Sequence, residues 1–301
     1  MSTGVAQAIV DRQKWLDDVS DAIQPVINNA FTNAGEGGRV VKDFLNGVWL
    51  GHPLHPVITD VPIGAWTMTA LLDGLSMARG GDEGLDRASD VTLGAGIVAA
   101  LGAAVTGIVD WSDVGGSHRR MGMAHALLNV GGLVLSLGSL GLRLGGDKRS
   151  RGLARVLSTG GYLVSATSAY VAGELVFNLG QAINRNAWTY GPDNFTDIAA
   201  ADEIATGRMH HYDIDGEAVV VVRDEHGIHA FGGICSHYGC GLWEGKLEGH
   251  TVTCQCHGSQ YDITTGDLIH GPATSPVPSY EARTLDGRLQ VRMQRVAGAA
   301  E

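Results

Sequence analysis

The sequence has few basic side chains and few cysteines, and both shortages limit what the protein does. Lysine and arginine number 21 against 32 acidic residues, so the formal net charge is −11. An acidic chain repels phosphate backbones, which argues against a nucleic-acid partner. The 44 glycines follow no Gly-x-y period, and the sequence has no Gly-x-Gly-x-x-Gly signature of a Rossmann-type nucleotide domain. The chain therefore does not itself oxidise NADH or hold a flavin on such a fold.

All four cysteines lie in one short stretch near the C-terminal end. The stretch contains two loops, Cys235-x-His237 and Cys254-x-x-His257, and each loop offers one thiolate and one imidazole. Two Cys and two His suit a [2Fe-2S] cluster whose two irons have different ligands. The same four ligands also suit a tetrahedral zinc ion.

This stretch resembles the Rieske iron–sulfur proteins of cytochrome bc-type complexes. Those proteins have a further cysteine pair at the positions of Cys240 and Cys256, and in that family the pair forms a disulfide that ties the ligand loops together. A zinc finger has no use for two more cysteines at these offsets, so we interpret the stretch as a Rieske centre. The resemblance covers residues 201–295 and implies an all-β domain with the ligand loops at one tip.

The resemblance also assigns roles to single residues. It implies that Cys235 and Cys254 hold the inner iron and that His237 and His257 hold the outer, solvent-facing iron. It implies further that the hydroxyl groups of Ser259 and Tyr261 donate hydrogen bonds to sulfur. It also implies that a proline loop, Gly271-Pro272-Ala273, covers the other side of the cluster. Donors to sulfur stabilise the reduced cluster, so we expect a high potential within about −150 to +300 mV. Read without the resemblance, Ser259 is a turn residue and Tyr261 a core aromatic.

Two residues depart from the family pattern. Gln255 stands where a proline is usual, and Tyr238 stands where quinol-oxidising members have a smaller aliphatic residue. Quinol oxidation is therefore an open question. A Rieske oxygenase needs a large domain with a second iron site after the cluster. Only 44 residues follow His257 in this sequence, so we do not expect that class.

Glycine clusters inside four long apolar runs upstream of the ligand loops, as is typical of closely packed membrane helices. The first run has Asp60 as its only formal charge and three prolines near its start, so we expect its continuous helix from about Val57. Since about 20 apolar residues cross a bilayer, we predict four transmembrane helices, from the runs 44–72, 91–109, 121–142 and 156–173. The segment led by Gly51-His52-Pro53-Leu54-His55-Pro56 resembles a family of four-helix bacterial membrane proteins of uncharacterised function.

Four spans return the chain to the side on which it began, so the C-terminal domain shares a face with several ionisable residues: His52, His55, Asp60, Asp110, His118 and His125. Such groups at membrane depth usually mark a pathway or a site. His55 and His125 come from different helices and are candidate axial ligands of haem b. Another metal or a quinone pocket is a second interpretation. In a third, the His-Pro pairs cap the first helix and bond to Asp60 or Asp110.

We therefore predict an α + β multidomain protein, a four-helix transmembrane bundle followed by an all-β Rieske domain. Apolar residues between Val10 and Ile27 recur at helical spacing, which indicates an amphipathic helix that lies on the membrane surface or packs on the protein. A polar linker either lets the Rieske domain swing or packs as a rigid strap. The expected divisions are an N-terminal segment 1–50, a transmembrane domain 51–180, a linker 181–200 and a Rieske domain 201–301.

The side of the membrane is predicted from charge and from cluster assembly. Basic residues near the spans are slightly fewer on the Rieske face, which by the positive-inside rule places that face outside, and a disulfide fits an oxidising compartment. However, a cluster assembled in the cytoplasm needs a twin-arginine route to leave it, and the only Arg-Arg pair, Arg119-Arg120, precedes the third span rather than the fourth. We therefore expect the Rieske domain on the cytoplasmic side.

Two classes of function are consistent with these features. In the first, the chain is a membrane-anchored one-electron carrier between a quinol, haem or soluble donor and a redox partner. In the second, it is a redox-responsive sensor or assembly factor in which the Rieske domain controls the helical domain.

Overall fold

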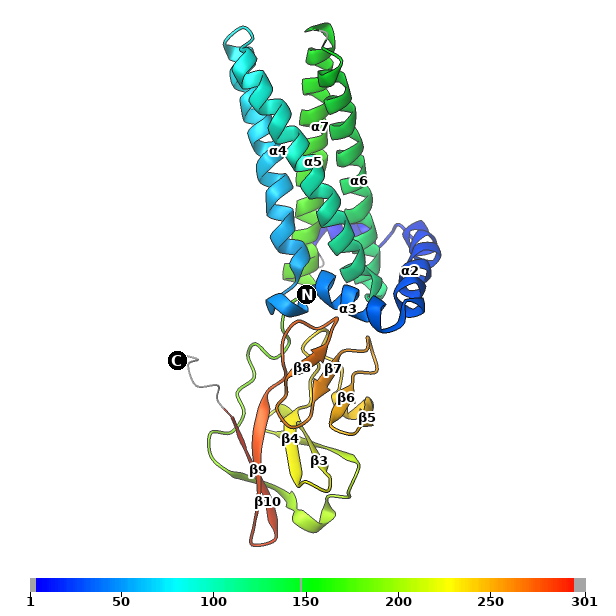
Figure 1. Cartoon of the computed structure of the whole chain (residues 1–301). Coiled ribbons are helices and arrows are strands. Elements are labelled where there is room, and N and C mark those ends of the chain that lie inside the picture. The colour runs from blue at the N-terminus through cyan, green and yellow to red at the C-terminus, as the bar shows by residue number, and fades with distance from the viewer. Residues whose placement is uncertain (1–3, 147, 295–301) are drawn as a thin grey trace. The chain divides into compact units, whose positions relative to one another are not determined.

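The computed structural model describes residues 4–146 and 148–294, and the chain divides into two compact units (Figure 1). The first, the helical unit, contains residues 1–41 and 53–181. The second, the β unit, contains residues 42–52 and 182–301. The order of elements, helices followed by a β-rich part, agrees with the predicted α + β architecture.

Seven α-helices precede the first strand in the described residues. Their bounds are α1 Val5–Val10, α2 Trp15–Asn33, α3 Gly35–Asn46, α4 Leu54–Ala78, α5 Glu83–Ser112, α6 Gly116–Leu144 and α7 Lys148–Gly173. A short 3-10 turn, Val48–Leu50, precedes α4, and a π-helical turn, Glu174–Asn178, ends α7. Helices α4 to α7 run side by side as a bundle (Figure 1).

Glycine permits close packing of α6 on α7. A Cβ atom added at Gly132 would lie 3.0 Å from the carbonyl oxygen of Gly161, and one added at Gly161 would lie 2.8 Å from the carbonyl oxygen of Gly132. Larger side chains at either position would force the two backbones apart. Gly132 and Gly161 therefore have the close-packing role that the clustering of glycine suggested.

Two of these helices, α5 and α6, are long and apolar enough to cross a membrane among the residues that the structure describes. Helix α4 carries Asp60 and Asp73, and α7 begins in a basic segment. Spanning by all four helices stays a prediction. The expected start of α4 at Val57 was wrong, because the helix begins at Leu54 with Pro56 in its first turn, where a missing N–H breaks no helical hydrogen bond.

A buried ionic network joins the ends of α4, α5, α6 and α7 and was missed in the sequence. The Arg143 guanidinium forms a bidentate salt bridge with Asp73. It also donates hydrogen bonds to the Asp90 carboxylate at 3.0 Å and to the Ser89 hydroxyl at 2.8 Å. The Arg143 side chain has no exposed surface. The predicted span 121–142 ends before Arg143, whereas α6 continues to Leu144 and places Arg143 inside the bundle.

Helix α2 packs on the protein, which agrees with one of the two predicted alternatives. The Gln24 amide donates to the carbonyl oxygens of Trp111 and Val114 at 3.0 and 2.8 Å. Arg120 pairs with Asp17 at 2.7 Å, and this bond lowers the pKa of Asp17. These contacts attach α2 to the connection between α5 and α6.

The β unit contains two antiparallel sheets. The larger has the strand order β1-β10-β9-β4-β3-β2, and the smaller has the order β5-β6-β7-β8. The strand bounds are β1 Thr196–Ala200, β2 Met209–Ile214, β3 Glu217–Arg223, β4 Ile228–Gly232, β5 Lys246–Glu248, β6 Thr251–Thr253, β7 Gln260–Asp262, β8 Leu268–His270, β9 Ser279–Leu285 and β10 Arg288–Met293. The β-rich fold of this part agrees with the all-β domain that the resemblance implied.

Four consecutive valines give β3 two buried faces. Val219 and Val221 pack in one core with β10 and β9, and Val220 and Val222 pack in a second core. The second core contains Cys235 and Cys254, both about 2% exposed. The ligand cysteines are thus held by the same apolar core that joins the two sheets.

The predicted linker packs on the β unit, which agrees with one of the two alternatives predicted for it. Residues 196–200 form β1, which pairs with β10. The backbone N–H of Arg185 donates to the Ser236 carbonyl at 3.1 Å, and the Asn186 amide donates to the Ile234 carbonyl at 2.9 Å. This segment is a strap on the β unit, because its polar groups bond the backbone beside the first ligand cysteine.

Candidate metal centre

The two ligand loops close with the same backbone pattern. In the first loop, the N–H of Cys235 donates to the Cys240 carbonyl and the N–H of Gly239 donates to the Cys235 carbonyl, both at 2.9 Å. The second loop repeats this with Cys254 and Ser259 at 2.8 Å and with Gly258 and Cys254 at 3.0 Å.

A glycine with positive φ, 78° at Gly239 and 82° at Gly258, stands four residues after each ligand cysteine. A left-handed backbone favours glycine there. This repeated spacing is a sequence signal that our sequence reasoning did not use.

The loops bring the four predicted ligands together. The thiols of Cys235 and Cys254 are both buried, and the Cys254 thiol is near enough to lower the pKa of Cys235. The rings of His237 and His257 have centroids 5.0 Å apart and are nearly perpendicular. Two sulfurs on the buried side and two imidazoles together are the donor set that a Rieske [2Fe-2S] cluster requires. The residues present therefore fit the cluster.

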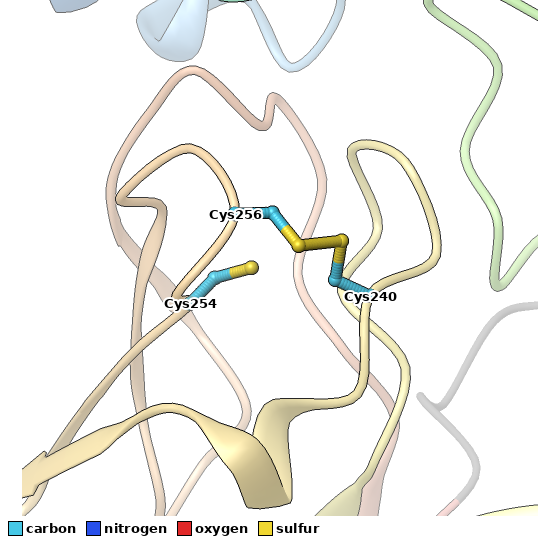
Figure 2. A group of neighbouring side chains, drawn as sticks. All are labelled: Cys240, Cys254 and Cys256. Atoms are coloured by element: carbon cyan, nitrogen blue, oxygen red, sulfur yellow. A yellow bond between two sulfur atoms is a disulfide. The ribbon is translucent and has the colours of Figure 1, made fainter.

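The third and fourth cysteines form a disulfide. Cys240 and Cys256 are bonded, with their Cα atoms 6.6 Å apart. The sulfur of Cys254 lies beside this bond (Figure 2). Because disulfide sulfurs are not thiolates, Cys240 and Cys256 do not serve as ligands. Their bond instead joins the first loop to the second.

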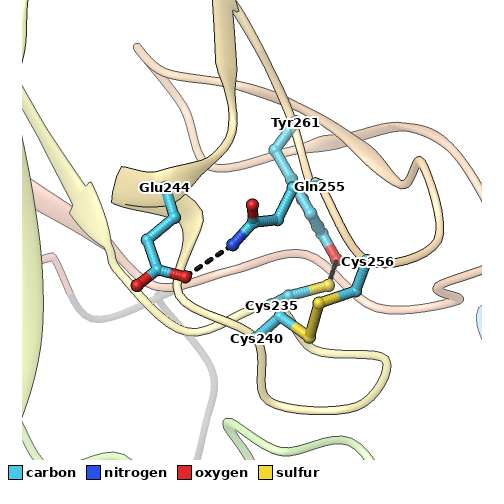
Figure 3. Close-up of a disulfide and its surroundings, with 6 residues drawn as sticks. All are labelled: Cys235, Cys240, Glu244, Gln255, Cys256 and Tyr261. Carbon is cyan, nitrogen blue, oxygen red and sulfur yellow. Dashed lines mark hydrogen bonds between the residues drawn. A yellow bond between two sulfur atoms is a disulfide. The ribbon is translucent and has the colours of Figure 1, made fainter.

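The Tyr261 hydroxyl lies against the ligand sulfur. Its oxygen is 3.3 Å from Cys235 Sγ (Figure 3) and 3.0 Å from Ser236 Oγ. Hydrogen bonds from Cys254 and then from Tyr261 lower the pKa of Cys235 to about 6, although burial acts in the opposite direction. Burial raises the pKa of Tyr261, so its hydroxyl keeps the proton that it donates.

Ser259 holds the proline loop. Its Oγ accepts a 3.0 Å hydrogen bond from the N–H of Ala273, and both residues are buried. The hydroxyl hydrogen of Ser259 is thereby left to donate elsewhere, as the predicted bond to cluster sulfur requires. Asp43 fixes the same loop from α3, since it pairs with His270 at 2.6 Å and accepts from the Gly271 N–H at 3.0 Å. The role of Asp43 had no signal in the sequence, because 227 residues separate it from His270.

The two departures from the family pattern have visible contacts. The Gln255 amide donates to the Glu244 carboxylate, which links the second ligand loop to the short helical turn Leu242–Glu244 (Figure 3). The Tyr238 ring lies against His237, and the Arg185 guanidinium carbon is 5.9 Å from its centroid. Tyr238 is therefore an aromatic neighbour of a predicted outer ligand.

Of the histidines predicted to lie at membrane depth, His55 and His125 are brought together by the fold, with ring centroids 6.2 Å apart. His55 Nδ1 bonds the Ala103 carbonyl at 2.9 Å and the Thr106 hydroxyl at 3.3 Å, so the interpretation that His55 bonds Asp60 or Asp110 was wrong. His118 bonds the Leu179 carbonyl at 3.1 Å. Asp60 is exposed, and His52 belongs to the β unit.

Fold and site together define a Rieske-type iron–sulfur protein. The family model described as Rieske [2Fe-2S] domain matches residues 194–281, and the model described as predicted membrane protein (DUF2231) matches residues 51–185. The chain belongs to the Rieske [2Fe-2S] family and carries a DUF2231 domain ahead of the Rieske domain. Both resemblances inferred from the sequence are confirmed.

Individual relatives share the Rieske part. The ferredoxin component of the alkene monooxygenase system of Xanthobacter autotrophicus is 31% identical over 98 residues, which are 32% of this chain and 80% of the relative. The cytochrome b6-f complex iron-sulfur subunit of Chlorobaculum tepidum is 28% identical over 158 residues, 51% of this chain and 86% of the relative. The solved ferredoxin of carbazole 1,9a-dioxygenase from Nocardioides aromaticivorans is 27% identical, with a TM-score of 0.31, and the match covers 33% of this chain and 96% of that one.

Proposed function

We propose that this protein is a membrane-anchored, high-potential one-electron carrier. A [2Fe-2S] cluster, when bound, supplies the one-electron redox chemistry. Cys235 and Cys254 would hold the inner iron, and His237 and His257 would present the outer iron to a partner. Homologous Rieske proteins act in electron transfer, as ferredoxins and as a cytochrome b6-f subunit.

The Tyr261–Cys235 contact is the observation that supports a high potential best. A hydroxyl 3.3 Å from a ligand sulfur stabilises the extra negative charge that reduction brings. Ser259, with its Oγ occupied as an acceptor, provides a second donor to sulfur.

A redox titration of the full chain in detergent, followed by electron paramagnetic resonance, tests this function. We expect a reversible one-electron couple in the upper part of the range of about −150 to +300 mV. Stopped-flow mixing with a quinol, a reduced cytochrome or a reduced ferredoxin would then identify the donor class. Lack of electron exchange with each of these would refute the carrier and favour the sensor or assembly function.

The proposed anchor is the bundle α4–α7 with the Rieske domain on the cytoplasmic side. The matched membrane-protein family and the apolar helices α5 and α6 support insertion in lipid. Reporter fusions after residue 301 test the side. Fluorescence from a green fluorescent protein fusion is expected, whereas activity of an alkaline phosphatase fusion would place this end outside.

A haem b between His55 and His125 is a second part of the proposal. The ring centroids of His55 and His125 are 6.2 Å apart, so the two imidazoles would be the residues that hold the haem iron. Each Nδ1 lies 2.9 Å from a backbone carbonyl, of Ala103 or Ser168, which leaves Nε2 as the acceptor nitrogen on both rings. The Asn129 amide bonds His125 Nε2 at 3.0 Å and would have to release it.

Optical spectroscopy of protein produced with added haem precursor decides this part. We expect a Soret band that is lost in His55→Ala and in His125→Ala and kept in the control His118→Ala. Absence of the band from protein that is fully loaded with the cluster would refute the haem site while leaving the cluster function untouched.

A further inference from the structure

A second group of metal-type side chains lies in the β unit, outside the ligand loops. Asp224 follows β3, His229 is on β4, and His250 is in the turn between β5 and β6. The Oδ2 atom of Asp224 is 3.0 Å from His229 Nε2 and 2.9 Å from His250 Nε2. The three ligand atoms all lie within 4.8 Å of one another.

The turn after β3 fixes the direction of the carboxylate. Asp224 Oδ1 accepts hydrogen bonds from the N–H groups of His226 and Gly227 at 2.8 and 3.0 Å. Its own N–H donates to the Gly227 carbonyl at 2.9 Å. One carboxylate oxygen is thus occupied by the turn, and the other is directed at the two imidazoles. The orientation does not depend on the imidazoles themselves.

These distances are close to those of a coordination shell. A tetrahedral ion with bonds of about 2.0–2.1 Å separates its ligand atoms by about 3.3 Å. Opening the two observed contacts by a few tenths of an ångström would therefore seat an ion. Another imidazole is near, because the His226 and His250 ring centroids are 5.4 Å apart and His226 Nδ1 is 4.0 Å from Asp224 Oδ1.

We propose that Asp224, His229 and His250 bind one divalent transition-metal ion, with His226 or water in the fourth position. Imidazole and carboxylate ligands suit zinc and copper, and the general order of affinities among first-row ions favours copper. Asp224 and His229 belong to β3–β4 of the six-stranded sheet, and His250 lies between β5 and β6 of the four-stranded sheet. The ion would therefore link the two sheets of the β unit.

The proposed ion site is separate from the cluster. His250 precedes β6 and Cys254 follows it, so the two lie at opposite ends of the strand, about 13 Å apart at about 3.3 Å per residue. The ion site can therefore be changed without touching a cluster ligand. The cluster signal then reports whether a variant is correctly folded.

Metal titration of the full-length, cluster-loaded protein, purified without a histidine tag, tests the site. Calorimetry with Zn²⁺ is expected to give one equivalent per chain, and affinity should fall at least about 100-fold in Asp224→Asn and His250→Gln. The control His211→Gln, which removes a ring stacked on Trp243 at 3.8 Å, should leave the affinity unchanged.

Continuous-wave electron paramagnetic resonance of wild-type protein with one equivalent of Cu²⁺ tests the same site independently. We expect hyperfine splitting from imidazole nitrogens, lost in His250→Gln, a substitution in an exposed turn. Absence of stoichiometric binding, or equal binding by wild type and His250→Gln with the cluster signal intact in both, would overturn the proposal and leave Asp224 as a purely hydrogen-bonded turn residue.

Discussion

The hydroxyl oxygen of Tyr261 lies 3.3 Å from the sulfur of Cys235, although 26 residues separate them. The contact is possible because β7 carries Tyr261 into the core that also buries Cys235. Both residues are nearly inaccessible to solvent, so water does not compete for this hydrogen bond.

Replacing Tyr261 by Phe should lower the midpoint potential of the cluster. A net hydrogen bond of about 1 kcal/mol corresponds to about 40 mV for a one-electron couple. Potentiometric titration measures the shift. The matched control is Tyr280→Phe, which removes a buried tyrosine hydroxyl from the other core of the same unit. Equal potentials in wild type and Tyr261→Phe would show that the contact does not tune the cluster.

Replacing both Cys240 and Cys256 by Ser should make cluster loss faster on heating. The disulfide closes a segment with a sequence separation of 16, and closing about 15 residues stabilises a folded domain by about 3 kcal/mol. Loss of the visible absorbance with temperature gives the measurement. This variant keeps all four proposed cluster ligands, so we expect its electron paramagnetic resonance signal to match that of wild type before heating. If wild type and the double variant lost absorbance at the same temperature, the proposal that the disulfide stabilises the two ligand loops would be wrong.

Replacing Arg143 by Met should destabilise the helical unit by about 3–5 kcal/mol, because Asp73 would be left as a buried charge without its guanidinium. Thermal unfolding in detergent, followed by circular dichroism, reports the change. Arg79→Gln is the matched control, since Arg79 is 65% exposed and pairs with Asp82 at 3.7 Å. That control should cost less than about 1 kcal/mol. Similar losses in both variants would refute the special role of the buried network.

Replacing Arg120 by Gln should loosen α2 from the connection between α5 and α6. The bond from Arg120 holds the pKa of Asp17 below its ordinary value of 3.8, so its stabilisation is complete above that value and is lost as the pH falls through the lowered pKa of folded Asp17. Hydroxyl-radical footprinting of α2 at pH 7 and pH 3 measures this. Wild type should become more reactive in acid, and Arg120→Gln should be reactive at both values. Protection of α2 that is the same in all four samples would contradict the prediction.

The features predicted correctly from the sequence are those that depend on residues close together in the chain. Cysteine and histidine spacing predicted the two loops, and the resemblance carried by the same residues predicted a β-rich C-terminal domain. Apolar runs with few charges predicted the four long helices α4 to α7, with errors of up to eight residues at their ends. These features depend on neighbours within a few positions.

Contacts between distant segments were the features that could not be predicted. The Asp43–His270 pair and the Arg143–Asp73 pair join residues 227 and 70 positions apart. A charged residue near the end of an apolar run has the same appearance whether it faces solvent or a buried partner. The placement of Arg185 and Asn186 on the first ligand loop was similarly hidden, because a polar segment rich in Asn and Gly is also typical of a free linker.

The account depends most directly on imidazole ligation of the cluster. Pulsed electron paramagnetic resonance of the reduced, full-length protein measures this, since it detects nitrogen coupled to the iron. We predict couplings from two imidazole nitrogens, together with loss or strong reduction of the signal in His237→Cys. A cluster without imidazole coupling, an unchanged signal in His237→Cys, or zinc in place of iron would contradict the assignment of Cys235, His237, Cys254 and His257 as the ligands.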